Sequence, residues 1–155
     1  MSGVMRRVVL LTFGVLTLGI AANDFGGTWK LNVEKSKLPP KASFVSQIMS
    51  VESLGPKKMR IAWEYILKTG QKQRSEVVFT CDGQEHPAPE IGPDFTATCE
   101  KINDTSDRIV TKKAGKTILE TMNTLSDSGK VITVSQESFL RSGGQVDQTL
   151  LYERQ

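Results

Sequence analysis

The sequence predicts an all-β domain, an antiparallel up-and-down meander of about 8–10 strands. Apolar and polar residues alternate with a period of two along most of the chain after residue 25, which is typical of half-buried strands. Clusters of glycine, asparagine, aspartate and serine interrupt the alternation at short intervals and can reverse the chain. Strands of this number and length either close into a barrel or stack as a sandwich to hide their edges.

The alternating segments follow one another along the chain, and each is expected to form a strand. The cleanest is 59–67, where Trp63 and Tyr65 share a face. In the segment before it, Val45 and Met49 are expected to share a face. The expected strands cover residues 25–33, 45–51, 59–67, 77–81, 95–99, 108–112, 117–125, 131–139 and 146–154.

Two segments break the meander. Residues 34–43 contain Pro39 and Pro40, and because proline cannot donate to a strand ladder, a loop that crosses between strands is expected there. Residues 82–93 form the longest irregular stretch, and two cysteines bracket it. Loops on a rigid scaffold often carry binding groups; the alternative is a surface excursion without a role.

The first 22 residues or so predict a cleavable signal peptide. Arg6 and Arg7 precede an uncharged apolar run, residues 8–22, which is shorter than the ~20 residues that a membrane-spanning helix needs. Small residues favour cleavage after Ala21 or Ala22. The protein is therefore expected to be exported, either periplasmic or secreted, with no membrane anchor after cleavage.

Residues 23–155 are then long enough for one domain and too short for two. Loss of Arg6 and Arg7 with the signal lowers the formal net charge from +3 to +1. A nucleic-acid-binding protein would carry a basic stripe with interleaved aromatic residues. The nearly neutral mature chain therefore gives no indication of a nucleic-acid partner.

Cys81 and Cys99 remain in the mature chain. In an oxidising compartment an even pair most simply forms a disulfide, which would fix the base of the 82–93 loop. The alternative is two buried free thiols. No metal site is expected, because the chain has a single histidine and no Cys-x-x-Cys motif.

Both ends of the mature chain resemble the calycins, the superfamily of the lipocalins and fatty-acid-binding proteins. Residues 24–33, DFGGTWKLNV, carry a Gly-x-Trp motif like that of the calycin opening strand, and residues 151–154, LYER, resemble the closing strand of the fatty-acid-binding branch. Together with the signal and the central DGQEHP of residues 82–87, they are similar to lipocalin-like proteins exported by soil bacteria. The resemblance implies a lipocalin-like β-barrel over residues 23–155.

The resemblance also implies a structural role for Trp29. In calycins this tryptophan closes the floor of the barrel beneath a basic side chain, for which Arg154 and Arg141 are the candidates here. The fatty-acid-binding branch holds a carboxylate with an arginine two residues before the tyrosine of the last strand, and this chain has Leu150 there. The 34–43 segment also cannot form the two helices that cover the mouth in that branch.

The sequence offers no catalytic constellation, so we expect no enzyme activity and no cofactor. His86 is the only histidine and precedes a proline in the irregular segment, where an exposed side chain is the simplest interpretation. No Gly-x-Ser-x-Gly motif accompanies it. A general base beside a nucleophile is therefore missing from the sequence.

The remaining candidates for a site are Trp63, Tyr65 and Tyr152, with Arg60 and Met59 nearby. Inward aromatic side chains with a polar tip suit an amphipathic ligand in a barrel; the alternative is that they fill a narrow core. The first functional hypothesis is thus a non-enzymatic carrier of a small hydrophobic or amphipathic molecule. The second is a protein-interaction module, such as a hydrolase inhibitor or an envelope-associated protein, that acts through the Cys81–Cys99 loop.

Overall fold

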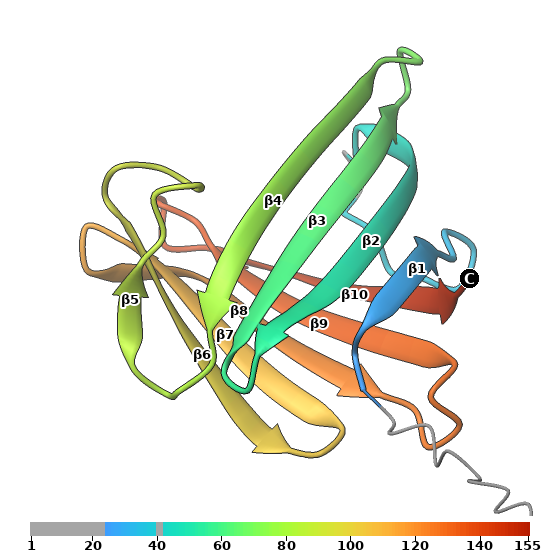
Figure 1. Ribbon diagram of the computed structural model, residues 1–155. Helices are drawn as coiled ribbons and strands as arrows, with labels where there is room; N and C mark the ends of the chain where they lie inside the picture. The colour runs from blue at the N-terminus through green and yellow to red at the C-terminus, as the bar shows by residue number, and fades with distance from the viewer. Residues whose placement is uncertain (1–23, 40–41) are drawn as a thin grey trace, which may run out of the picture.

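A computed structural model describes residues 24–39 and 42–155. The predicted signal peptide, residues 1–22, lies outside the described residues, as does Pro40 of the first predicted loop. The described chain forms ten strands and no helix (Figure 1). The strands are β1 Gly27–Leu31, β2 Phe44–Gly55, β3 Lys58–Leu67, β4 Lys72–Thr80, β5 Glu85–Pro87, β6 Phe95–Asn103, β7 Ser106–Lys113, β8 Lys116–Leu125, β9 Val131–Phe139 and β10 Gln145–Arg154.

All ten strands belong to one antiparallel sheet, in the order β4-β3-β2-β1-β10-β9-β8-β7-β6-β5. The first and last strands of the chain are neighbours, with Trp29 opposite Arg154, and the sheet curls round on itself (Figure 1). β4 and β5 are the two edges of the sheet and do not pair with each other. The prediction of an antiparallel barrel is confirmed, and the barrel is closed except for the gap between these two edges.

The barrel has two ends that differ in their connections. The turns β2–β3, β6–β7 and β8–β9 lie at the end that contains Trp29, which we call the floor. The opposite end, the mouth, carries the turns β3–β4, β7–β8 and β9–β10 and the segment that joins β1 to β2. As predicted, that segment forms no helix in its described residues; Lys37 instead pairs with Thr149 of β10 in an isolated bridge.

Two details of the strands differ from the sequence prediction. The register of β2 against β3 shifts between Phe44 and Ser46, and this irregularity leaves Val45 52% exposed while Met49 is buried, so the two side chains do not share an environment. β5 lies inside the stretch predicted to be irregular and pairs with β6, His86 opposite Ala97. A three-residue strand that contains a proline is too short to show alternation.

The predicted disulfide is confirmed. Cys81, just after β4, is bonded to Cys99 in β6, with the two Cα atoms 4.3 Å apart. The Cys81 N–H donates to the Lys57 carbonyl in the β2–β3 turn at 2.6 Å, which places the bridge toward the floor. The disulfide therefore ties β4 to β6 across the gap at its lower end, where no ladder joins the two sides.

Candidate ligand-binding cavity

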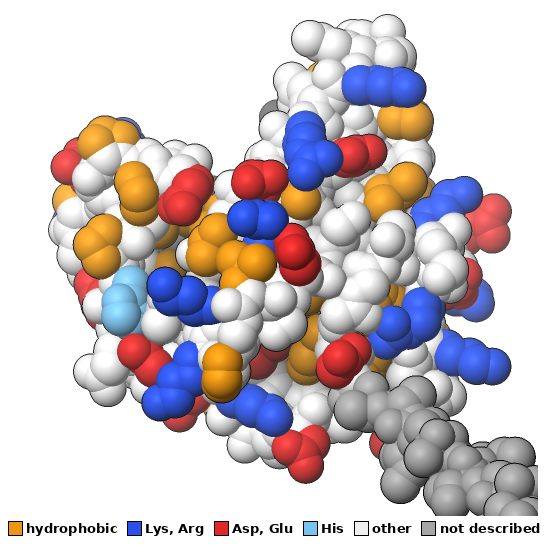
Figure 2. Space-filling model, in the orientation of Figure 1, with side chains coloured by type: hydrophobic (Ala, Val, Ile, Leu, Met, Phe, Trp, Pro, Cys, Tyr) orange, Lys and Arg blue, Asp and Glu red, His pale blue; other side chains and the backbone are white. Residues whose placement is uncertain are grey.

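The inward faces of the strands enclose a cavity of about 630 Å³. This volume is within the range of pockets that bind small molecules, roughly 300–1,000 Å³. Exposed residues of β4 and of the 88–93 segment belong to its lining, so the cavity opens sideways through the upper part of the gap. Figure 2 shows hydrophobic side chains in the hollow between the two lobes of the molecule.

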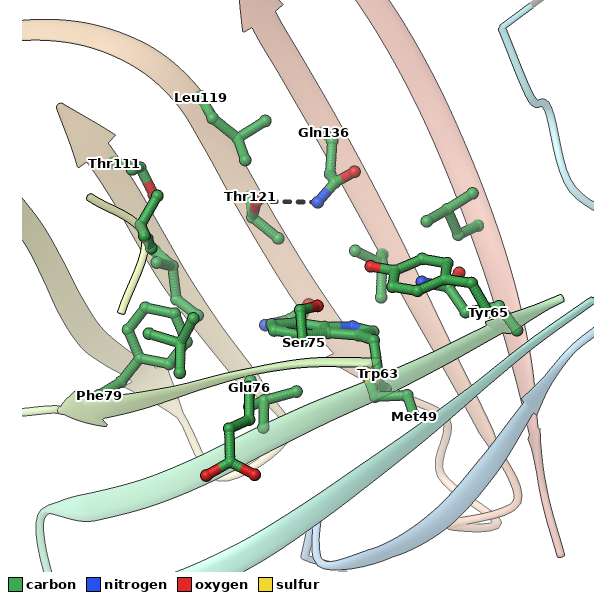
Figure 3. Close-up of a pocket in the computed structure, with 18 of the residues that line it drawn as sticks. Met49, Trp63, Tyr65, Ser75, Glu76, Phe79, Thr111, Leu119, Thr121 and Gln136 are labelled. Carbon is green, nitrogen blue, oxygen red and sulfur yellow. Dashed lines mark hydrogen bonds between the residues drawn. The ribbon is translucent and has the colours of Figure 1, made fainter. Parts of the chain in front are cut away.

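One wall of the cavity is apolar and aromatic. It comes from β2, β3 and β4, whose period-two alternation directs every second side chain inward. Trp63 and Tyr65 extend from β3 into the cavity (Figure 3). The Phe44 ring lies against Tyr65, with the ring centroids 5.9 Å apart. The apolar residues of this wall are Phe44, Met49, Ile61, Trp63, Val77 and Phe79.

The opposite wall carries uncharged polar side chains in a row across three neighbouring strands. Thr121 of β8 lies opposite Gln136 of β9, which lies opposite Gln148 of β10. Gln136 Nε2 donates to Thr121 Oγ1 at 3.3 Å (Figure 3). Gln148 Nε2 in turn donates to Gln136 Oε1. We call Thr121, Gln136 and Gln148 the amide row; all three line the cavity.

Tyr152 lies deep in the cavity wall, 1% exposed. Its hydroxyl donates to Gln47 Oε1 at 2.7 Å, and burial raises the pKa of the phenol. The side chain therefore stays neutral and is committed to a protein partner. Leu150, two residues before it, lines the cavity where the fatty-acid-binding branch places its arginine.

The structure brings together three of the five residues predicted for the site. Trp63, Tyr65 and Tyr152 all line the cavity, whereas Arg60 and Met59 do not. Arg60 pairs with Glu52 at 2.8 Å on the exposed surface, because it alternates with the inward residues of β3. Met59 lies lower, beside a second small cavity near the floor.

The amide row was missed by sequence reasoning. A signal was available, since Gln136 has the phase of the buried Val134, and Gln148 that of the buried Leu150 and Tyr152. Polar residues in a strand are usually assigned to its solvent face, and only closure of the sheet shows that these face inward.

Trp29 closes the floor of the barrel. It is 0% exposed, and the Arg154 guanidinium lies over its ring, 4.1 Å from the centroid. Arg154 also donates to the carbonyls of Asp24, Gly26 and Gly129 at 2.7–2.9 Å. The other candidate partner, Arg141, lies in the exposed turn at the opposite end of β10.

Gly27 is required by this arrangement. Its φ is +124°, and a Cβ atom there would lie 2.8 Å from the Arg154 Nη1, so any larger residue would displace the guanidinium.

Asp107 is a carboxyl buried above the floor, 6% exposed. Its Oδ1 accepts from Asn123 Nδ2 at 2.7 Å, and both residues line the small cavity that also contacts Phe25 and Met59. Burial raises the pKa of this carboxyl to about 6, more than the hydrogen bond from Asn123 lowers it. Asp107 is thus protonated in the folded protein at pH values where it is ionised in the unfolded chain.

We expect the stability contributed by Asp107 to fall as the pH rises from about 4 to about 6. The folded state holds the proton over this window and the unfolded state does not, so ionisation costs the folded state about 3 kcal/mol above pH 6. Asp107→Asn keeps an oxygen acceptor for Asn123 and removes the charge. In urea unfolding, the variant should be more stable than the wild type at pH 7 and equal to it near pH 4.

Other carboxyls do not obscure this comparison. Hydrogen bonds with neighbouring side chains lower the pKa values of Glu85 and Glu153. Their contributions to folding stability are lost as the pH falls, but these contributions are the same in the variant and the wild type. A stability difference between variant and wild type that does not change with pH would contradict the assignment.

No metal-binding group of histidine, cysteine and carboxylate side chains occurs in residues 24–39 and 42–155. Within those same ranges, no helix is long and apolar enough to span a bilayer.

The ten-stranded, nearly closed antiparallel barrel is a calycin fold, lipocalin-like in its architecture. Among solved structures, the fluorescent protein UnaG is similar over 84% of this chain and 97% of its own, with a TM-score of 0.60 and 17% identity. The zebrafish ileal bile acid-binding protein, solved with cholic acid, is similar over 84% and 98%, with a TM-score of 0.53 and 11% identity. Comparisons with protein-family models and with curated proteins find no significant match.

Proposed function

We propose that this protein is an exported, non-enzymatic carrier that binds a small hydrophobic or amphipathic molecule inside its barrel. The observation that carries the proposal is the 630 Å³ cavity, which has an aromatic wall and, opposite it, a row of polar side chains among apolar ones. Such a cavity buries the apolar part of a ligand while a few polar groups orient it. The bile-acid complex of a protein with the same fold is consistent with this use of the barrel.

Export is supported by the N-terminal sequence pattern and by the disulfide. Disulfides persist in oxidising compartments and are rare in the cytosol, and Cys81 and Cys99 are paired. A non-enzymatic role is supported by the position of His86, whose Nε2 lies 2.9 Å from Asp82 Oδ1 outside the cavity lining.

The alternative, a protein-interaction module that acts through the Cys81–Cys99 loop, has less support. Two polar side chains of this loop already have partners within the molecule: Glu85 accepts from Thr96 of β6 and from Lys112 of β7, and His86 contacts Asp82 of the same loop. We therefore put the carrier function first.

Native mass spectrometry of the protein collected from its own cells tests the carrier proposal. We expect a chain that lacks its first 21 or 22 residues and retains an adduct of roughly a few hundred daltons. Trp63→Ala should lower the bound fraction about tenfold, because it removes much of the aromatic wall. Ile66→Ala is the matched control, since Ile66 lies on the same strand and is exposed outside the cavity.

The two parts of the proposal fail separately. An intact N-terminus would contradict export. A mass without adduct, for wild type and variants alike, would contradict the carrier function.

A further inference from the structure

We propose that the cavity takes ligands with a flat apolar body and an uncharged hydrogen-bonding edge, such as a carboxamide, alcohol or ketone, and discriminates against carboxylates. This inference rests on the proposed carrier function and narrows the class of ligand.

Within the part of the chain that the structure describes, charged residues of the cavity lining are confined to its rim. They are Arg74 and Glu76 on β4 and Glu90 in the 88–93 segment, all of them exposed. The two carboxylates and one guanidinium of the lining sum to a charge of −1, which opposes the approach of an anion. The deeper lining is neutral.

Arg74, the one cation of the lining among residues 24–39 and 42–155, is already paired. Arg74 Nη1 donates to Glu64 at 3.0 Å and Nη2 donates to Glu76 at 3.3 Å. The guanidinium would have to leave both carboxylates to bind an anion inside the barrel. Leu150 occupies the position of the arginine in the fatty-acid-binding branch and offers no positive charge. A carboxylate drawn into the cavity would therefore lose its water without gaining a counter-ion from the described lining.

The amide row offers neutral groups in place of a cation. Each hydrogen bond of the amide row uses one N–H of a glutamine. The row therefore leaves four groups for a ligand: the second N–H of Gln136, the second N–H of Gln148, the Gln148 carbonyl and the Thr121 hydroxyl hydrogen. Donors and acceptors therefore occur together. This pattern matches a ligand group that both donates and accepts, as a primary amide does.

The wall that faces the row selects the rest of the ligand. Trp63 and Phe79 present aromatic surface across the cavity from Thr121 and Gln136 (Figure 3). A flat apolar body against the rings would direct its polar edge to the row, which satisfies the inward amides that a purely hydrocarbon ligand would leave buried without partners.

A pair of probes that differ only in the head group tests the inference. 11-(Dansylamino)undecanoic acid and its primary amide share fluorophore and chain, and energy transfer to the dansyl group from the two tryptophans, Trp29 and Trp63, reports binding. At pH 7.5 we expect the amide to bind about tenfold more tightly, a difference of about 1.4 kcal/mol. The difference in affinity is no larger than this because the acid can leave its head group in water at the mouth.

Two variants locate the effect. Leu150→Arg should reverse the preference by supplying a cation inside the cavity. Gln136→Leu nearly keeps the side-chain size and breaks the amide row. It should weaken binding of the amide probe about fivefold and leave binding of the acid probe unchanged. This variant also tests the inference if Leu150→Arg does not fold. Gln145→Leu, on the exposed end of β10, is the control and should change neither affinity.

The outcomes separate this inference from the proposed function. If the acid binds as tightly as the amide, the barrel is a carrier and the inference is wrong. If neither probe binds, the carrier function itself is contradicted, and the inference falls with it.

Discussion

Trp29→Ala is expected to destabilise the protein by about 3–5 kcal/mol, the largest effect of any single substitution considered. The variant leaves a void at the floor, removes the Nε1 donor to the Phe25 carbonyl, and deprives Arg154 of the ring beneath it. Because small domains are stable by only about 5–15 kcal/mol, part of the population should be unfolded at 37 °C. Urea unfolding followed by circular dichroism measures the loss.

The other tryptophan supplies the matched control. Trp63 is only partly buried and borders the open cavity, so Trp63→Ala removes atoms from a wall that already contacts solvent, and should cost about 1–2 kcal/mol. Equal losses for the two variants would contradict a closing role for Trp29.

Removal of the disulfide is expected to cost about 3 kcal/mol. The Cys81–Cys99 bridge closes a loop with a sequence separation of 18, and this figure follows from the restriction of the unfolded chain by a loop of that size. We expect the Cys81→Ala, Cys99→Ala double variant to melt about 10 °C lower than the oxidised wild type. Wild type under reducing conditions should behave like the double variant.

The loss should also be localised. The bridge joins β4 to β6 where no strand pairing does so. Without it, the two sides of the gap are joined at this end by the short 81–84 connection and the hydrogen bond from the Gly83 N–H to the Cys99 carbonyl. Amide hydrogen exchange should therefore accelerate in the last residues of β4 and in β5 more than in β8 and β9. A uniform acceleration, or an unchanged melting temperature, would contradict this role of the bridge.

Much of the fold could be predicted from alternation. Segments such as 131–139 coincide with an observed strand, because each packs one face against the core and the other against water. The bulge beside Val45 could not be predicted, since it arises from the pairing of β2 with β3. Barrel closure was likewise indicated only by the resemblance at the two ends of the chain.

The candidate site could be predicted only on its apolar side. Trp63 and Tyr65 stand out by size and phase, whereas Gln136 and Gln148 are ordinary strand residues until the curvature of the sheet turns them toward the cavity. Arg60 is close to Trp63 in sequence, but strict alternation directs its side chain outward. Phase along the strand was the better guide.

The gap in the barrel also leaves two strand edges open to association with other chains. Along 72–76 of β4 every residue is exposed, and its backbone has no ladder partner on the outer side. An unpaired edge of this kind is a template for adding another strand. Here Lys72, Arg74 and Glu76 lie on that edge, and Arg74 is held in ion pairs with Glu64 and Glu76. A second strand could pair only by stripping water from these charges, so the edge beside the cavity opening resists aggregation.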